Sequence, residues 1–230
     1  MILIDTHTHL YLDAFNDDRD EVIHNAIAND VKILLLPNID SKHAENMLNL
    51  CERFPANCFP MMGLHPGSVK MDFLKELEHV ESNLKKGHFI AIGETGMDFY
   101  WDKTYKKEQE LAFRKQLDLA GTYELPIVIH SREAIDELID ILNESPNKGI
   151  TGVFHCFTGT HEQAEKIINL GFRLGIGGVL TFKNSGLKEV VRDIDLKHII
   201  LETDAPFLAP VPYRGKRNES AYIRLVAEKL

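Results

Sequence analysis

The segment ILIDTHTHL, residues 2–10, joins an apolar run to two histidines spaced two residues apart. In a β-strand alternate side chains share a face, so His7 and His9 would point one way while Thr6 and Thr8 point the other. Two imidazoles that converge on one point are a common pair of metal ligands. The same spacing also arises by chance, so the other candidate ligands in the chain must decide between the two interpretations.

Five further residues that could do chemistry follow other apolar runs. Glu94, His130, His155 and Asp204 each end such a run, and His65 follows another. If these runs are parallel strands of a barrel, their carboxyl ends meet at one rim and bring the side chains together. Buried charged groups are rare unless they are paired or bound to a metal ion. The combined pattern therefore predicts a metal centre at that rim.

The number of candidate ligands suggests how they would be shared. They are too few for two closed metal sites but sufficient for two open sites that have one ligand in common. A carboxylate can bridge ions about 3.5–4 Å apart, and Glu94 lies in the middle of the strand order. We expect one ion to bind His7, His9, Glu94 and Asp204, and the other to bind Glu94, His130 and His155. Glu94 and Asp204 are the predicted catalytic residues, because water activated by the ions needs a group that accepts its proton, and Asp204 can face both.

The elements that must position these side chains alternate along the chain. Short apolar runs typical of buried strands occupy residues 2–5, 31–37, 59–66, 88–94, 125–130, 151–156, 171–178 and 198–204. Segments with helical periodicity lie between them at residues 18–28, 41–54, 71–85, 105–120, 132–142, 161–170 and 187–194. Ser41 is the expected N-cap of the second of these helices.

This alternation predicts parallel βαβ units and, with eight strands, a (β/α)8 TIM barrel. A chain of 230 residues provides roughly 29 residues per unit, which is near the usual size for that barrel. The alternative is a doubly wound open sheet, which needs a glycine-rich loop after its first strand. That position holds DTHTHL, which contains no glycine. The absence of internal repeats and linkers favours a single domain over residues 1–230.

Composition restricts the compartment and the partners. Hydrophobic residues make up 44% and charged residues 27% of the chain, and no run approaches the roughly 20 apolar residues of a membrane span. No secretory signal is recognisable, and three cysteines form no disulfide framework, so we expect a cytoplasmic protein with reduced thiols. A net charge of −9 argues against broad electrostatic capture of nucleic acid. It leaves room for a local site that binds a few phosphates with the help of metal ions.

Several blocks together resemble the TatD-type metal-dependent deoxyribonucleases, a family of amidohydrolase-like barrels. The blocks are DTHTHL (5–10), GLHP (63–66), IGETGMDFY (92–100), HSR (130–132), HCFTG (155–159), LETDAPFLAP (201–210) and PYRGKRNE (212–219). They occur in the family's order over the whole chain. The resemblance implies a TIM barrel with two divalent ions, Mg²⁺, Mn²⁺ or Zn²⁺, and hydrolysis of DNA from the 3′ end of single strands.

The resemblance also implies roles for individual residues. It places metal ligands on His7, His9, Glu94, His130, His155 and Asp204, the set that the strand ends indicate, and substrate-binding residues near a phosphate on His65 and Arg132. The chain departs from the family at its end, because members usually continue through a further helix and closing segment. We therefore expect a truncated last helix within residues 221–230, and Ser220 stands where a proline is usual.

Two other features admit more than one interpretation. The aromatic segment MDFYWDKTY, residues 97–105, either packs the top of the barrel or offers faces on which nucleobases stack. Glu202 shares strand parity with Asp204 and would lie one layer deeper, where it would orient Arg132 or a ligand histidine.

Three functions are compatible with this site. The first is a phosphodiesterase that acts on DNA or another phosphate-containing substrate, with Arg132 as a bidentate phosphate clamp. The second is an amide or ester hydrolase, including a D-aminoacyl-tRNA deacylase, in which the same ions would polarise a carbonyl group. The third is a non-catalytic metal-binding scaffold, which is disfavoured because it would not need the complete set of ligands.

Overall fold

Eight parallel strands lie in chain order in the computed structural model, which describes residues 2–101, 103–147 and 149–230. They are β1 Leu3–Asp5, β2 Val31–Pro37, β3 Cys58–Met61, β4 Ile92–Asp98, β5 Ile127–Arg132, β6 Gly152–Phe154, β7 Phe172–Ile176 and β8 Ile199–Leu201. Continuous hydrogen bonding joins β1 to β3 and β4 to β8. Single bridges from Met62 to Ile92 and from Thr8 to Ala205 connect the two sheets and close the ring.

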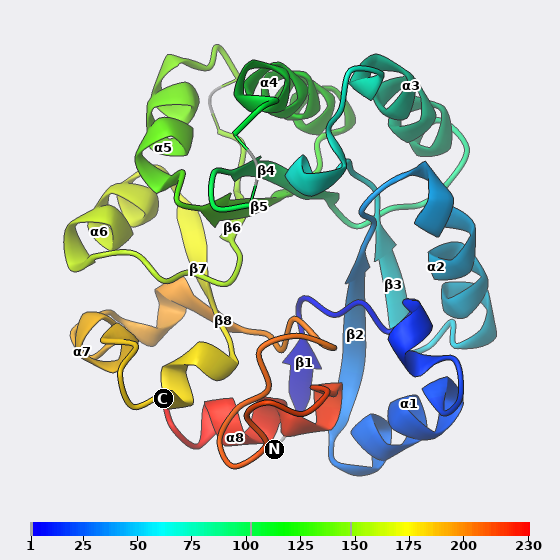
Figure 1. Ribbon diagram of the computed structural model, residues 1–230, viewed down its shortest axis with the longest axis vertical. Helices are drawn as coiled ribbons and strands as arrows, with labels where there is room; N and C mark the ends of the chain where they lie inside the picture. The colour runs from blue at the N-terminus through cyan, green and yellow to red at the C-terminus, as the bar shows by residue number, and fades with distance from the viewer. Residues whose placement is uncertain (1, 102, 148) are drawn as a thin grey trace.

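Helices surround this ring, as Figure 1 shows in a view along the barrel. Within the described residues they are α1 Arg19–Ala28, α2 Ser41–Arg53, α3 Phe73–Leu84, α4 Lys106–Tyr123, α5 Ile135–Glu144, α6 His161–Asn169, α7 Leu187–Val191 and α8 Ile223–Ala227. The predicted (β/α)8 barrel is confirmed. Among these helices, none is long and apolar enough to cross a bilayer.

Strand periodicity explains how the barrel aims its polar groups. Leu34 and Leu36 of β2 belong to the large core between strands and helices, whereas Leu35 packs with a smaller cluster on the opposite, inner face. Val128 of β5 belongs to the same inner cluster. His130 lies two residues further along β5, so its side chain also points into the barrel, one layer nearer the carboxyl end.

Two sequence predictions about element boundaries were wrong. The strand predicted at 88–94 lies at Ile92–Asp98, so Glu94 is inside β4 and does not end it. The error arose because the apolar run ends before the strand does: every residue of β4 is buried, including its charged ones. The N-cap of α2 is Asp40 and not Ser41, because the Asp40 carboxylate accepts hydrogen bonds from the amides of Lys42 and His43.

Candidate metal centre

The His-Thr-His segment leaves β1 as extended chain held on both sides. The Thr8 amide donates to Leu35 of β2 at 3.1 Å, and the His9 amide donates to Ala205 after β8 at 2.7 Å. These bonds keep the alternation of a strand, so both imidazoles point into the barrel. The Nε2 atoms of His7 and His9 are 3.2 Å apart, and both residues are buried.

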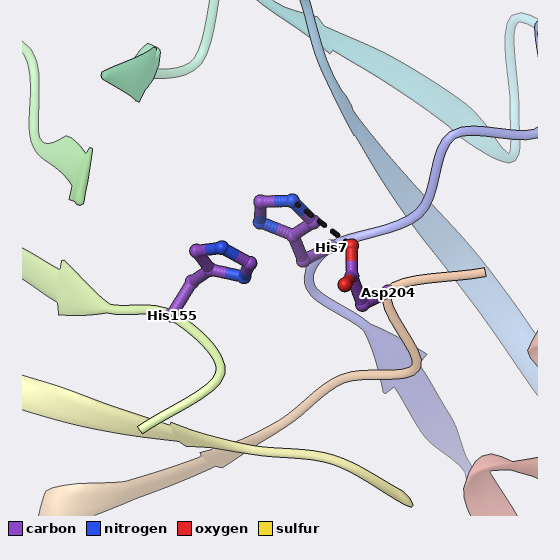
Figure 2. Close-up of side chains that lie close together, drawn as sticks. All are labelled: His7, His155 and Asp204. Atoms are coloured by element: carbon purple, nitrogen blue, oxygen red, sulfur yellow. Dashed lines mark ion pairs between the residues drawn. The ribbon is translucent and has the colours of Figure 1, made fainter. Parts of the chain in front are cut away.

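Two carboxylates complete a first group around these nitrogens. Glu94 Oε2 lies 3.1 Å from the Nε2 of His7 and 3.4 Å from that of His9. Asp204 Oδ1 lies 3.7 and 3.5 Å from the same two atoms. Asp204 has a left-handed backbone, with φ of 56°, and its amide donates to the carbonyl of His7 at 2.9 Å. Figure 2 shows its carboxylate turned toward the His7 ring, which stacks on His155 with centroids 3.8 Å apart.

The other oxygen of Glu94 faces a second group. Glu94 Oε1 lies 2.9 Å from His130 Nδ1 and 2.9 Å from His155 Nε2. Those two nitrogens are 3.4 Å apart. The carboxylate of a single residue, 2% exposed, therefore divides the site into two sets of donors.

Both sets fit divalent cations. Ligand atoms that lie about 2.0–2.2 Å from one ion are separated by about 3–3.5 Å in tetrahedral or octahedral geometry. The separations here are 3.1–3.7 Å in the first set and 2.9–3.4 Å in the second. Imidazole and carboxylate donors suit zinc and manganese. The structure thus brings all six predicted ligands together, but not strictly in the predicted partition: His155 also groups with His7 and Asp204, and His65 groups with Glu94 and His130. Their role as ligands stays a prediction.

Tyr11 determines the tautomer of His9. Its hydroxyl donates to the carbonyl of Pro37 and therefore accepts from His9 Nδ1, 2.8 Å away. With the hydrogen on Nδ1, the lone pair of His9 Nε2 faces the two carboxylates, as metal binding requires. Sequence reasoning missed Tyr11, although it shares strand parity with His7 and His9.

Asp98 determines the tautomer of His130. Its Oδ2 lies 2.8 Å from His130 Nε2, which leaves the lone pair of Nδ1 for the second set. Asp98 Oδ1 accepts from the amides of Tyr100 and Trp101 at 2.9 and 3.2 Å. Sequence reasoning missed Asp98 because it ended β4 at Glu94. Continued alternation along the strand would have placed Asp98 on the same face as Glu94.

Glu202 is expected to contact either Arg132 or a ligand histidine, and in the structure it lies beside the histidine. Its Oε1 accepts from the Cys156 amide and lies 3.5 Å from His155 Nδ1, so it contacts a candidate ligand and not Arg132. A side chain at Gly175 would overlap the Glu202 carboxylate. Glycine at this position therefore makes room for the Glu202 carboxylate beside His155.

His65 differs from the other histidines of the site. Its Nδ1 accepts a hydrogen bond from the Gly67 amide at 2.9 Å, so the hydrogen of the neutral ring is on Nε2. That Nε2 points toward Glu94 Oε1 at 3.4 Å and toward the cavity that His65 lines. Because a protonated nitrogen has no lone pair for a metal ion, His65 is suited to donate a hydrogen bond to an oxygen.

Above the two groups of donors lies a cavity of about 600 Å³. Arg132 lines it and stacks on two exposed aromatic rings, with its guanidinium carbon 3.9 Å from the centre of Tyr100 and 5.3 Å from that of Trp101. Asp102 of the predicted aromatic segment lies outside the described residues. Phe207, 52% exposed, also lines the cavity. The aromatic segment therefore contributes rings to the mouth of the site.

Opposite charges stabilise each other in this buried site. Burial raises the pKa of Glu94, but the charges of His155 and the other histidines around it outweigh burial and hold that pKa well below its usual value. Burial lowers the pKa of His9, but its hydrogen bonds with Asp204 and Glu94 raise it to about 9. Glu94 is therefore ionised in the folded protein, as a bridging ligand would need to be.

A (β/α)8 barrel with imidazoles and carboxylates gathered at its carboxyl rim defines a metal-dependent hydrolase. Comparison with known proteins identifies the family: residues 4–230 match the model of the TatD related DNases, and the chain belongs to that family. It is 36% identical to an uncharacterized metal-dependent hydrolase, YabD, of Bacillus subtilis, with 100% of this chain and 90% of that protein aligned. It is 30% identical to the 3′–5′ ssDNA/RNA exonuclease TatD of Salmonella typhimurium, over 99% of this chain and 90% of that protein.

The solved structure of a TatD homologue agrees with this membership, and a more distant structure shares only the fold. The crystal structure of YjjV, a TatD homologue from Escherichia coli, superposes with a TM-score of 0.91 at 29% identity, covering 99% of this chain and 88% of that one. A phosphotriesterase homology protein from Escherichia coli, solved with phosphate in its active site, shares the fold at 14% identity with a TM-score of 0.66, covering 88% of this chain and 81% of that one.

Proposed function

We propose that this protein is a nuclease that uses two divalent ions, Mg²⁺, Mn²⁺ or Zn²⁺, to hydrolyse phosphodiester bonds of single-stranded DNA from the 3′ end. The observation that carries the proposal is the division of the Glu94 carboxylate between two sets of donors. Paired ions suit in-line displacement at phosphorus, because one can stabilise the attacking oxygen and the other the leaving oxygen. The Salmonella relative named as a 3′–5′ ssDNA/RNA exonuclease supports the substrate class.

The residues would share the reaction as follows. His7, His9, Glu94 and Asp204 would hold one ion and Glu94, His130 and His155 the other. The Asp204 side chain is 15% exposed and lines the cavity, so it can accept the proton of the attacking water. Arg132 and the Nε2–H of His65 face the same cavity and would donate hydrogen bonds to the phosphate oxygens.

A nuclease assay with labelled DNA tests this proposal. After removal of metal with EDTA, single-stranded DNA labelled at its 5′ end should stay intact, and Mn²⁺ or Mg²⁺ should restore stepwise shortening from the 3′ end. Asp204→Asn should lower kcat by about 10²-fold or more while KM changes little, because the lost group acts on the proton rather than on DNA binding.

Two results would overturn the proposal. One is a metal-loaded protein that leaves single-stranded and double-stranded DNA and RNA intact. The other is release of D-amino acids from D-aminoacyl-tRNA by the same sample, which would favour the amide and ester hydrolase. Both functions would use the same cavity, which Arg132 and Asp204 line. Only assays with both kinds of substrate therefore distinguish the nuclease from the amide and ester hydrolase.

A further inference from the structure

Two basic residues line the cavity, Lys70 and Arg132. Basic side chains elsewhere are often paired with a carboxylate, as Arg217 is with Asp18 at 2.6 Å. In the described part of the chain, neither Lys70 nor Arg132 has a carboxylate within ion-pair distance. In a chain with a net charge of −9, two cations beside one cavity that have no ion pair with any described residue are suited to an anion from outside the protein.

The two cations enter the cavity from different elements. Arg132 ends β5, whereas Lys70 follows the short 3-10 helix Pro66–Ser68 in the loop after β3. The Lys70 ammonium lies 5.2 Å from the ring centre of Tyr105, which also lines the cavity. This cation–π contact holds the charge at the wall of the cavity without neutralising it.

We propose that Lys70 and Tyr105 form a second phosphate subsite, which binds the phosphodiester next to the one that is cleaved. The inference rests on the proposed nuclease function and deepens it. The scissile phosphate would be held by the metal centre, His65 and Arg132, so a separate cation at the same cavity serves a separate phosphate. The ligand of this subsite is the phosphodiester backbone of a nucleic acid, which a lysine ammonium binds as a point charge without reading sequence.

The subsite predicts a preference for substrates with at least two neighbouring phosphodiesters. The test compares the wild type with Lys70→Gln and with Lys75→Gln, a matched loss of charge at an exposed position of α3 outside the cavity. The substrates are bis(p-nitrophenyl) phosphate, which has one phosphodiester, and a single-stranded oligonucleotide. A second oligonucleotide carries one uncharged methylphosphonate, placed in turn on each side of the scissile bond.

Lys70→Gln should raise KM for the oligonucleotide about tenfold and lower the log–log salt slope of KM by about one, with kcat nearly unchanged. Bis(p-nitrophenyl) phosphate should be hydrolysed equally by all three proteins. The methylphosphonate should raise KM for the wild type and Lys75→Gln on one side only, and should have no further effect on Lys70→Gln.

The outcomes separate the two proposals. If neither substrate is hydrolysed by the metal-loaded wild type, the nuclease function is wrong and the subsite with it. If DNA is hydrolysed and Lys70→Gln has the KM of the wild type, only the subsite is wrong. An equal effect of Lys70→Gln and Lys75→Gln would assign the loss to net charge and would also overturn the subsite.

Discussion

At the scale of single residues, the hydrogen bond at the second ring nitrogen distinguishes His9, His130 and His65, whereas the Nδ1 atoms of His7 and His155 have no hydrogen-bond partner among the described residues. His9 has Tyr11 at this second nitrogen and His130 has Asp98, whereas the Glu202 carboxylate lies 3.5 Å from the second nitrogen of His155. When the rings of His9 and His130 are neutral, these bonds leave the other nitrogen with its lone pair directed at Glu94. His65 is the reverse case, because an amide donates to its Nδ1. His9 and His130 on the one hand and His65 on the other therefore have two distinct kinds of role among the five histidines beside Glu94.

Asp98 provides the first test of this arrangement. Asp98→Ala should weaken metal binding about 10–100-fold, because the His130 ring loses the partner that fixes its tautomer and orientation. Isothermal titration of the metal-free protein with Mn²⁺ measures the loss without any substrate. Asp98→Asn should retain more affinity, since its amide oxygen can still accept from His130 Nε2. Equal affinity of wild type and Asp98→Ala would contradict the assigned role.

The raised pKa of His9 predicts how metal affinity depends on pH. With a pKa of about 9 in the metal-free protein, His9 is an imidazolium at neutral pH and must lose a proton before Nε2 can bind an ion. Affinity should therefore rise with pH by about tenfold per unit for each proton released, and the rise should continue through the deprotonation of His130 and His155, whose pKa values are also raised. Titrations at neutral and alkaline pH in two buffers of different ionisation enthalpy measure both affinity and proton release. Affinity that is constant over this range would refute the prediction.

At the scale of elements, the pairing of β4 with β5 brings the two groups of donors together. Gly96 of β4 is the register partner of His130 and has φ of +129°. A β-carbon there would overlap the carbonyl oxygen of His130. The glycine therefore permits the close approach of the two strands that carry Glu94 and His130.

Gly96→Ala should lower the free energy of unfolding by about 3 kcal/mol, from steric overlap added to an unfavourable backbone conformation. Gly186→Ala is the matched control: Gly186 also has positive φ, at 68°, but a β-carbon there meets no atom within 4 Å. Gly186→Ala should therefore lower the free energy of unfolding by only about 1 kcal/mol. Urea denaturation measures both, and a Gly96→Ala protein as stable as the control would show that the overlap is relieved cheaply.

The elements also show what the sequence could and could not predict. Apolar runs predicted the existence of every strand, though not the correct bounds of β4, because a strand buried on both faces is typically a continuous apolar segment. They failed at β4, where Glu94 and Asp98 are buried by virtue of their polar partners and interrupt the apolar pattern. Contacts that depend on tertiary structure, such as Asp98 with His130 or Gly67 with His65, have no signature in the spacing of residues.

At the scale of the whole molecule, a buried polar contact joins the first strand to the segment that follows the last one, beside the bridge that closes the barrel. Asp5 at the end of β1 accepts from the hydroxyl of Thr203 at 2.6 Å and from its amide at 3.0 Å. Both residues are essentially inaccessible to solvent. The contact lies next to His7 and Asp204 in the chain, so a bond that joins the two ends of the barrel also lies beside the first set of donors.

Removal of this contact should destabilise the whole barrel. Thr203→Val leaves a buried acceptor of Asp5 without its hydroxyl partner and should cost about 2 kcal/mol. Thr122→Val on the exposed surface of α4 is the control and should change stability by less than about 0.5 kcal/mol. Thermal or urea unfolding of both variants checks the difference, and equal stability of the two would mean that the barrel closes independently of this bond.

The whole-molecule prediction from sequence succeeded because alternation of strands and helices leaves few topologies for eight parallel strands. The same topology brings His7, near one end of the chain, beside Asp204, near the other, although nothing in their local sequences requires it. The cavity above the metal centre, with Lys70 and Tyr105 at its wall, depends on the loops and could not be predicted.

The central claim is that Glu94 bridges two ions in one centre. Anomalous diffraction from crystals grown with Mn²⁺ tests it most directly, because it locates each ion independently of activity. We predict two anomalous peaks about 3.5–4 Å apart, one beside His7 and His9 and one beside His130 and His155, with Glu94 between them. A single peak, or two peaks that do not share Glu94, would contradict the two-ion centre.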